Sequence, residues 1–463
     1  MLGPVTTAFH TLNLQPALLE ALEQLGYVEM TPIQASSLPP MLQEKDVIGQ
    51  AKTGSGKTAA FGLALLQAVD TALSSTQALV LCPTRELAEQ VAVELRRLAQ
   101  RQANTHIITV CGGRPSRDQA RALQGGAHVV VGTPGRIGKH LRTEAMSLRA
   151  LRVLVLDEAD RMLDMGFIEE VGAIVDRCPR QRQTLLFSAT FPTEVSYLSD
   201  RIQHHPQRVT VETQVAPEQL EERVYECTAA QRNQLIVDLL AEVAPTTALV
   251  FCETRDDCKK LASFLTGRGA VALALHGEME QRDRDDVLLQ FSNGSASVLV
   301  ATNLAARGLD VPALPLVIIA EVSPDPENHL HRIGRTGRAG ETGLALTVVA
   351  GQKEAERLDS IEAQMGHKIP RFPAPTGGKG LAFLQPPNRT LLILSGRKDK
   401  IRKGDVLGFL VKDAGVPSEL IGRIDLMPNA CAVAIGKEFA ERAVTHLKNG
   451  RIKNKRVRVQ LLG

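Results

Sequence analysis

ALVLCPTR (Ala78 to Arg85) returns 170 residues later as ALVFCETR (Ala248 to Arg255), and HVVVGT (His128 to Thr133) returns 169 residues later as SVLVAT (Ser297 to Thr302). Two matches at nearly one offset indicate a duplicated domain rather than chance. In each copy a short apolar run precedes a turn and a polar, helix-like segment, which is typical of buried parallel strands. The sequence therefore predicts an α/β fold with two tandem parallel-sheet domains that join near residues 211–217.

A third, smaller domain is expected after these copies. Residues 368–387 contain five prolines and three glycines and are predicted to form a linker. The β-α-β-β-α-β order beyond it, a small α+β domain, is carried by strands at 390–394, 420–426, 430–436 and 456–462 and helices at 401–411 and 437–450. Asn449-Gly450 is expected to end the second helix in a left-handed conformation. The predicted domains are 1–210, 217–365 and 387–463, with a linker at 366–386.

Charge and composition narrow the function classes. The 463 residues are 44% hydrophobic and 23% charged, as in ordinary globular proteins. Residues 386–463 carry a net charge of +9, whereas the preceding residues carry −6. This basic block favours either a polyanionic partner or a solvated face.

The seven scattered cysteines form no Cys-x-x-Cys pair, which disfavours disulfide and metal frameworks. With no leader or membrane span expected, the protein is predicted to be cytoplasmic, with no membrane partner.

AKTGSGKT (Ala51 to Thr58) lies between a short apolar run and a helix-like segment, the context of a phosphate-binding loop. The two glycines allow backbone N–H groups to approach phosphates, and the helix N-terminus favours an anion. Lys57 is expected to reach the β and γ phosphates, and Thr58 to bind Mg²⁺; a simple glycine-rich turn is the alternative. The candidate ATP-binding residues here are Gln50, Ala51, Lys52, Thr53, Gly54, Ser55, Gly56, Lys57 and Thr58.

VLVLDEAD (Val153 to Asp160) is an apolar strand that ends in three carboxylates. Such a cluster is costly without a cation, because like charges repel. Beside a phosphate-binding loop, Asp157 is predicted to bind Mg²⁺ and Glu158 to activate the attacking water. A solvated acidic turn is the alternative.

From Phe9 to Gly351 the motifs and their order resemble the DEAD-box RNA helicases of superfamily 2. The resemblance implies an RNA-dependent ATPase that unwinds short duplexes, with two RecA-like domains. It places Gln34 of TPIQ, within a motif at about 7–35, on the adenine base. Phe9 would stack on that base, although a lone Phe is more often part of a core. By the same resemblance the RNA-backbone residues are Arg85, Gly113, Thr133 and Arg136, and the residues coupling hydrolysis to unwinding are Asp160, Ser188, Thr190 and His331.

The second copy contributes further motifs of this family. In ATNLAARGLD (Ala301 to Asp310), Thr302 would face RNA and Asp310 the ribose, and Asn303 departs from the commoner Asp. HRIGRTGRAG (His331 to Gly340) supplies Arg335 and Arg338, which the family uses as catalytic arginine fingers. Hydrolysis would then require the two copies to close on ATP, and RNA that bridges them would favour closure.

The third domain resembles an RNA recognition motif, but ACAVAIG (Ala430 to Gly436) lacks the usual stacking aromatics. Phe409 and Phe439 are expected in its core, so RNA binding would depend on charge. Two basic clusters are candidates, one with Arg397, Lys398, Lys400, Arg402 and Lys403 and the other with Lys448, Arg451, Lys453, Lys455, Arg456 and Arg458.

Core and third domain together resemble a bacterial subfamily of these helicases that is directed to ribosomal RNA. The resemblance implies a 23S rRNA hairpin in pre-50S particles as the partner, ATP and Mg²⁺ as cofactors, no other metal, and a monomer. A general RNA chaperone with non-specific affinity, a non-catalytic ATP-gated RNA clamp and a DNA helicase are the alternatives.

Overall fold

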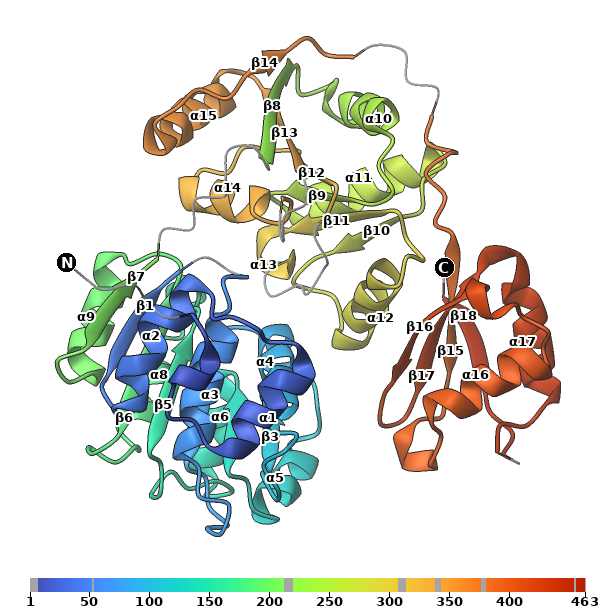
Figure 1. Ribbon diagram of the computed structural model, residues 1–463. Coiled ribbons are helices and arrows are strands. Elements are labelled where there is room, and N and C mark those ends of the chain that lie inside the picture. The colour runs from blue at the N-terminus through green and yellow to red at the C-terminus, as the bar shows by residue number, and fades with distance from the viewer. Residues whose placement is uncertain are drawn as a thin grey trace. The chain divides into compact units, whose positions relative to one another are not determined.

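The structure is a computed structural model that describes residues 7–51, 54–211, 220–306, 314–337, 343–375, 380–453 and 455–462. These residues form two compact units, one ending at Val211 and the other beginning at Leu220 (Figure 1). Among the described residues, no helix combines the length and the apolar character needed to cross a membrane.

The first unit is built on a seven-stranded sheet in the order β3-β4-β2-β5-β6-β1-β7, with every pair of neighbours parallel. Along β2, Ala78 and Val80 belong to one hydrophobic cluster and Leu79 and Leu81 to another, so both faces of the sheet are buried. This is the fold expected of strands that are apolar throughout. The strands are β1 (Val47–Gln50), β2 (Ala78–Leu81), β3 (Ile107–Val110), β4 (Val129–Gly132), β5 (Val153–Asp157), β6 (Gln183–Ser188) and β7 (Gln207–Thr210).

Helices cover this sheet on both sides (Figure 1). They are α1 (Pro16–Leu25), α2 (Pro32–Leu42), α3 (Lys57–Ala68), α4 (Arg85–Leu98), α5 (Ser116–Gln124), α6 (Pro134–Arg142), α7 (Ala159–Asp164), α8 (Ile168–Val175) and α9 (Thr193–Ile202), after a short 3-10 helix at Phe9–Thr11.

The second unit repeats the plan. Its parallel sheet has the order β10-β11-β9-β12-β13-β8-β14, which matches the first order strand for strand. The echoed sequences are β2 and β9, and β4 and β11, so the prediction of a duplicated parallel-sheet fold is confirmed. The strands are β8 (Leu220–Cys227), β9 (Ala248–Cys252), β10 (Ala272–Leu275), β11 (Val298–Thr302), β12 (Leu316–Ile319), β13 (Gly343–Ala350) and β14 (Arg371–Phe372). The helices are α10 (Arg232–Val243), α11 (Arg255–Gly267), α12 (Gln281–Ser292), α13 (Asn303–Ala306), α14 (Pro326–Ile333) and α15 (Gln352–Met365).

The C-terminal domain has an antiparallel sheet in the order β16-β17-β15-β18, with the predicted succession of strands and helices. Its elements are β15 (Asn388–Ile393), α16 (Lys403–Lys412), β16 (Ile421–Leu426), β17 (Cys431–Gly436), α17 (Ala440–Asn449) and β18 (Val459–Leu462). Phe409 is buried in the core as expected, and Phe439 packs against it partly buried.

The expected left-handed end of the last helix is wrong. Gly450 has φ −95° and ψ −173°, which is extended backbone. A glycine is needed there for space, because a Cβ atom on Gly450 would lie 2.6 Å from the Phe409 ring.

The predicted linker is not a free tether where the structure describes it. Strand β14 joins the second sheet beside β8, and Leu381 and Leu384 are buried in the core cluster of the second copy. Prolines and glycines prevent long ladders, but two apolar side chains and a two-residue strand still bind this segment to the sheet.

One face of the C-terminal sheet packs against the second copy. Thr390 on β15 is fully buried, and its hydroxyl lies 2.8 Å from Asn293 Nδ2 and 2.9 Å from Ser295 Oγ in the loop after α12. The Asn388 side chain donates to the Asn293 carbonyl at 3.1 Å. Because the helices of the domain occupy the opposite face, this sheet is enclosed on both sides of β15.

Candidate functional site

The predicted motif residues of the first unit gather at the carboxyl edge of its sheet. Neighbouring strands β1, β6 and β5 end at the phosphate-binding loop, at Ser188 and at Asp157, whereas β2, β4 and β3 lead into the proposed RNA motifs. Carboxyl ends of parallel strands are the usual place for ligands in α/β sheets. The residues predicted to bind ATP therefore lie along one half of this edge, and those predicted to contact RNA lie along the other half.

The phosphate-binding loop has the backbone that its sequence predicts. Gly54 and Gly56 adopt φ values of 86° and 93°, which favour glycine. Lys57 begins α3 and is 6% exposed, and its ammonium donates to the Ala51 carbonyl at 2.8 Å. Thr58 follows, half-buried. Lys57 is thus held over the loop with its charge directed at the loop backbone.

Gln34 lies against this loop. Its amide donates to the Gly56 carbonyl at 3.1 Å, and its side-chain oxygen accepts the Thr31 N–H at 2.8 Å. Thr31 in turn donates from its hydroxyl to the Ser55 carbonyl at 2.8 Å. A Cβ on Gly56 would approach Gln34 to 2.6 Å, so this packing needs the glycine. The contacts tie the predicted base-reading residue to the phosphate-binding loop.

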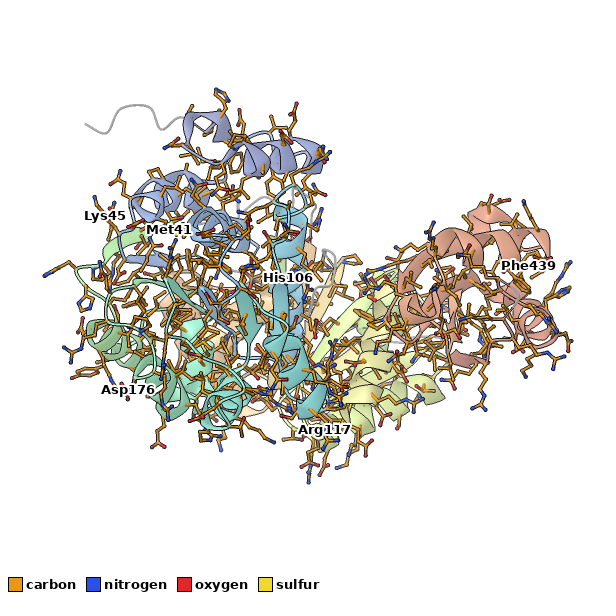
Figure 2. The ribbon with its side chains drawn as sticks, turned by 90° about the horizontal axis from the view of Figure 1, so that it is seen from below. Met41, Lys45, His106, Arg117, Asp176 and Phe439 are labelled. Atoms are coloured by element: carbon orange, nitrogen blue, oxygen red, sulfur yellow. The ribbon has the colours of Figure 1, made fainter. Side chains whose placement is uncertain are left out.

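Helix α2, which carries Gln34, is anchored to the sheet at its other end. The Gln183 amide at the start of β6 donates to the carbonyls of Met41 and Lys45 at 2.8 and 2.7 Å. Figure 2 labels Met41 and Lys45 at this end of the unit. The helix is thereby fixed relative to β6, whose far end carries Ser188.

Phe9 is only 4% exposed and packs edge-on against Tyr27, with ring centroids 6.1 Å apart. In this arrangement it belongs to the hydrophobic core, the alternative role considered for it. Its stacking on adenine stays a prediction.

The carboxylate at the end of β5 is buried beside two others. Asp157 is 3% exposed, and burial raises its pKa to about 7, with Lys57 opposing the shift and Glu158 and Asp160 adding to it. An uncompensated buried carboxylate favours a cation. The residues therefore fit Mg²⁺ bound together with a nucleotide.

Glu158 and Asp160 have different surroundings. Glu158 has φ 54°, a left-handed conformation at the start of α7 that is unusual for a side chain of this size. The Asp160 carboxylate accepts from the Thr190 N–H and hydroxyl, both at 2.9 Å, while the Asp160 N–H donates to Ser188 Oγ at 3.2 Å. Three of the four predicted coupling residues are thus brought into one hydrogen-bonded cluster.

The residues predicted to contact RNA are also held in place by hydrogen bonds at this edge of the sheet. Arg85 begins α4 behind Thr84, whose hydroxyl accepts the Leu87 N–H at 3.2 Å. Arg136, in α6, whose N-cap is Thr133, donates to the Arg114 carbonyl at 3.2 Å, and Arg114 follows Gly113, which has φ 75°. The predicted contacts therefore lie on three adjacent strand ends.

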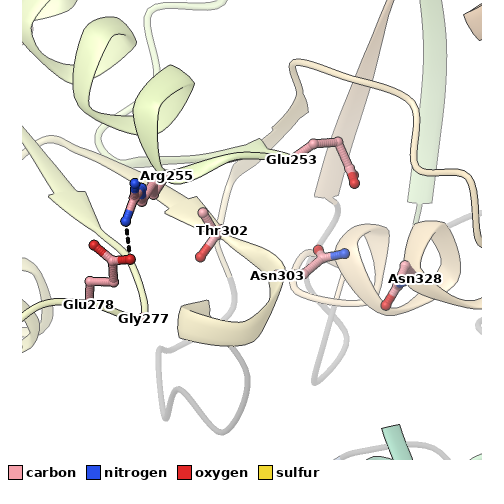
Figure 3. A pocket seen from close by; sticks show the side chains of 7 residues that line it. All are labelled: Glu253, Arg255, Gly277, Glu278, Thr302, Asn303 and Asn328. Carbon is pink, nitrogen blue, oxygen red and sulfur yellow. Dashed lines mark hydrogen bonds and ion pairs between the residues drawn. The ribbon is translucent and has the colours of Figure 1, made fainter. Parts of the chain in front are cut away.

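In the second copy, Thr302 lines a cavity of about 400 Å³ at the ends of β9 and β11 (Figure 3). Its other lining residues are Glu253, Arg255, Gly277, Glu278, Asn303 and Asn328. Two of the lining residues, Arg255 and Glu278, form an ion pair, so this arginine is held by a carboxylate.

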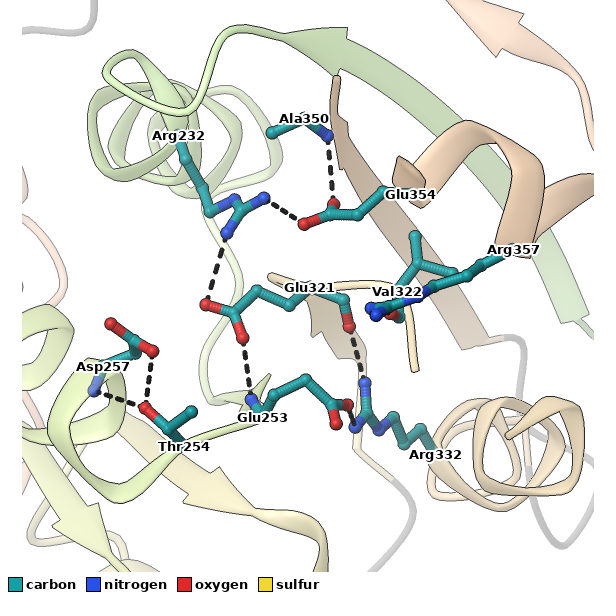
Figure 4. A network of polar contacts seen from close by, with 10 residues as sticks. All are labelled: Arg232, Glu253, Thr254, Asp257, Glu321, Val322, Arg332, Ala350, Glu354 and Arg357. Carbon is teal, nitrogen blue, oxygen red and sulfur yellow. Dashed lines mark hydrogen bonds and ion pairs between the residues drawn. The ribbon is translucent and has the colours of Figure 1, made fainter. Parts of the chain in front are cut away.

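A charge network that was not found from the motifs includes Glu253 of this cavity (Figure 4). Arg232 pairs with Glu321 at 3.2 Å and with Glu354, and Glu321 also accepts the Glu253 N–H at 3.0 Å. Arg332 contacts Glu253 and donates to the Glu321 carbonyl at 2.7 Å. Only Arg332 lies in a recognised motif; the rest is assembled from strand and helix ends far apart in sequence.

His331 lies on α14 and Arg335 just after it, both half-buried. Lys52, Thr53, Asp310 and Arg338 lie outside the described residues.

The two basic clusters of the C-terminal domain meet in one surface. The Lys453 ammonium donates to the Lys400 carbonyl at 3.2 Å, and the Lys455 ammonium to the Asp399 carbonyl at 3.1 Å. Lys453 also pairs with Asp405 at 3.1 Å. We call this exposed surface the basic face; it contains Arg397, Lys398, Lys400, Arg402, Lys403, Lys448, Arg451, Lys453 and Lys455.

Comparisons with known proteins agree with this geometry. The DEAD/DEAH box helicase family matches residues 31–198, the helicase conserved C-terminal domain residues 231–340, and the DbpA RNA binding domain residues 390–461. The ATP-dependent RNA helicase DbpA of Escherichia coli is 49% identical over 457 residues, which cover 98% of this chain and all of that protein. The chain belongs to the DEAD-box RNA helicases.

This helicase is also similar to other members. The CshA helicase of Bacillus cereus is 42% identical over 371 residues, 80% of this chain and 70% of that protein. The solved structure of Saccharomyces cerevisiae Dbp5 bound to RNA and ADP BeF3 has a TM-score of 0.73 and 29% identity, covering 80% of this chain and 96% of that one. Membership implies RNA-dependent ATP hydrolysis and helicase activity.

Proposed function

We propose that this helicase is directed by its basic face to a 23S rRNA hairpin and remodels short duplexes during assembly of the 50S subunit. The observation that carries the proposal is the union of two basic clusters on one exposed surface, in a domain that matches the DbpA RNA binding domain. We further propose that it acts in the cytoplasm as a monomer.

ATP hydrolysis is assigned to the first copy. Lys57 would bind the β and γ phosphates, and the loop amides would surround them. Thr58 and Asp157 would hold Mg²⁺, which neutralises phosphate charge when bound. Glu158 would orient the attacking water, and Arg335 and Arg338 of the second copy would stabilise the charge that develops on the phosphate.

Hydrolysis is coupled to RNA through the centre of the same edge. Asp160 binds Thr190 directly. They follow β5 and β6, which lie between β1 with its phosphate-binding loop and β2, the first of the strands that lead into the proposed RNA motifs. A shift of the β5 end on loss of phosphate would therefore move Thr190. Arg85, Gly113, Thr133 and Arg136, with Thr302 on the second copy, would contact the backbone and carry no sequence preference.

The C-terminal domain would supply the target. Its sheet face at Thr390 packs against Asn293 and Ser295, so that part of the sheet is not open for base stacking. The basic face instead offers lysines and arginines to phosphates, and hairpin shape would select the partner.

The test compares RNA affinity of the full chain for the 23S rRNA hairpin and for a scrambled hairpin. Lys398→Gln combined with Lys403→Gln removes two charges of the basic face. We expect the preference for the hairpin to fall about tenfold, and the log–log salt slope by roughly 0.7–0.9 per lost phosphate contact. Lys412→Gln with Lys437→Gln removes the same charge elsewhere in the domain and should keep the preference.

The competing function is a general RNA chaperone. It predicts equal affinity for both hairpins and equal stimulation of ATP hydrolysis by unrelated RNA. That result would reject the rRNA target while RNA-stimulated hydrolysis itself remains.

A further inference from the structure

Arg332 is a buried cation in the second copy. Its side chain is 1% exposed, and its guanidinium lies 5.5 Å from the centre of the Phe251 ring. Nε donates to Asn303 Oδ1 at 2.6 Å, Nη1 donates to the Glu321 carbonyl at 2.7 Å, and Nη2 donates to the Glu253 carboxylate. Each guanidinium nitrogen thus donates to a protein oxygen. Figure 4 shows the contacts with Glu321 and Glu253.

Only one of these three acceptors is a carboxylate. Asn303 offers a neutral amide at the position where the helicase motif commonly has Asp, and Glu321 offers a backbone carbonyl. A buried guanidinium without a counter-charge is costly, because it loses its hydration. Glu253 therefore supplies the charge that Asn303 lacks.

Glu253 is held in place for this contact. It follows β9 directly, and its N–H donates at 3.0 Å to the Glu321 carboxylate, which Arg232 holds at 3.2 Å. Asn303 follows β11, the parallel neighbour of β9, and both residues line the cavity that contains Thr302 (Figure 3). The two side chains thus approach Arg332 from adjacent strand ends.

Arg332 links these strand ends to the arginine motif. It lies on α14 next to His331, and the Arg335 N–H donates to its carbonyl at 3.1 Å. Loosening Arg332 would therefore loosen the turn that carries Arg335.

We propose that Glu253 is a positioning residue for ATP hydrolysis, which supplies the counter-charge of Arg332 in place of a carboxylate at 303 and so fixes the turn of Arg335. This inference rests on the proposed role of Arg335 in hydrolysis. In this chain the carboxylate stands on the other strand end beside the same guanidinium.

The experiment removes the carboxylate at position 253 and then introduces one at position 303. Glu253→Gln in the full chain should lower the RNA-stimulated kcat per folded molecule at least tenfold with little change in KM for ATP. Adding Asn303→Asp to Glu253→Gln should restore kcat to within about threefold of the parent. Glu221→Gln removes a carboxylate from an exposed pair with Arg223 on β8 and should leave kcat unchanged.

A second readout reports on the pair without activity. The Nη–H signals of Arg332 in ¹⁵N spectra, assigned by their loss in Arg332→Lys, should be slow to exchange in the parent and fast in Glu253→Gln, because Nη2 donates to Glu253. In the double variant the Nε–H signal, which reports on residue 303, should exchange more slowly than in Glu253→Gln alone. Thermal unfolding measured alongside gives the folded fraction for each kcat.

Three results would overturn the proposal: kcat within twofold of the parent in folded Glu253→Gln, no recovery in the double variant, or a fall in kcat that the folded fraction explains entirely. If the parent and Arg335→Ala hydrolyse ATP equally with RNA, the proposed function of Arg335 fails, and with it the catalytic part of this inference. In that case the Nη–H and Nε–H signals still show whether Asn303→Asp replaces Glu253 as the partner of Arg332.

Discussion

The two parallel sheets share one strand order, yet the charged residues at corresponding places are used differently. In the first copy Lys57 begins the helix after β1 and Asp157 ends β5; in the second copy Arg232 begins the helix after β8, and Glu321 follows β12. Arg232 and Glu321 bond to each other at 3.2 Å, whereas the Lys57 ammonium bonds to a loop carbonyl. In the second copy the cation and the carboxylate neutralise each other. In the first copy no such bond joins Lys57 to Asp157, and we expect both side chains to bind a ligand.

The connecting turns explain this difference. Gly54 and Gly56 open the first turn at positive φ. The second turn runs through Thr228 to Gln231 without glycine, and the Gln231 side chain accepts the Thr228 N–H and hydroxyl at 3.2 and 2.8 Å. The Thr228 N–H and hydroxyl are thus bonded within the turn and do not point to a ligand. One scaffold thus gives the proposed ATP site where the lysine has no carboxylate bonded to it among the described residues, and a structural ion pair at the corresponding place in the second copy.

The largest effect is expected from substitutions at the proposed ATP site of the first copy. Lys57→Ala should lower ATP turnover by about 10²–10³-fold, because the cation that faces the phosphates is lost. Glu158→Gln should stall hydrolysis but keep ATP binding, since its shape remains. Steady-state turnover and nucleotide titration check both variants. Normal turnover in Glu158→Gln would contradict the role given to this carboxylate.

The equivalent change in the second copy should act on stability. Arg232→Ala leaves Glu321 and Glu354 without their shared cation, both largely buried. The cost of a broken buried pair is on the order of 3 kcal/mol of unfolding free energy. Urea unfolding measures this loss, and nucleotide titration should show unchanged ATP affinity. A loss of ATP affinity with stability intact would reverse the comparison.

The third prediction uses pH. Burial raises the pKa of Asp157 to about 7, so the folded state holds a proton that the unfolded state has released above pH 3.8. Stability from this group therefore falls as pH rises from about 4 to 7. Asp157→Asn should be more stable than the parent at pH 8 and should lose that advantage by about pH 4, while it no longer hydrolyses ATP. Thermal unfolding at the two pH values decides it; an advantage independent of pH would remove the raised pKa from the argument.

The smallest effect is expected at the helix N-caps, which have the same structure in both copies. Thr84 and Thr254 cap α4 and α11 in the same way, accepting the Leu87 and Asp257 N–H groups at 3.2 and 3.1 Å. Either residue changed to Ala should cost about 1 kcal/mol in its own helix. Hydrogen exchange in peptides from α4 and α11 measures each loss. Clearly unequal losses would show that the duplicated helices differ in stability.

Much of this could be predicted from the sequence because it depends on short segments. The echo of Ala78 to Arg85 predicts two sheets, since each repeat carries its own strand, turn and cap. The places of Lys57 and Asp157 beside the sheet edge follow from their motifs, because each motif is a strand, a turn and a helix start in sequence; their roles in ATP hydrolysis stay predictions. Local patterns also gave the succession of elements in the C-terminal domain.

The rest depends on residues brought together over long distances. Arg232 and Glu321 are 89 residues apart, and Thr390 and Asn293 are 97 apart, with no motif around them. Neither the closed charge pair nor the covered sheet face has a periodic signal. Gly450 was predicted to need a positive φ, but its need is space beside Phe409, which no helix-end rule describes.

The hydrogen bonds of Thr390 and Asn388 to the loop after α12 have a consequence for RNA selection. A domain on a flexible linker raises the effective concentration of its partner over a wide range of separations. A docked domain gives this gain only where the RNA itself matches the separation. Affinity for an RNA with both a hairpin and a duplex should therefore depend on the number of nucleotides between them and pass through a maximum, as with a rigid bivalent ligand.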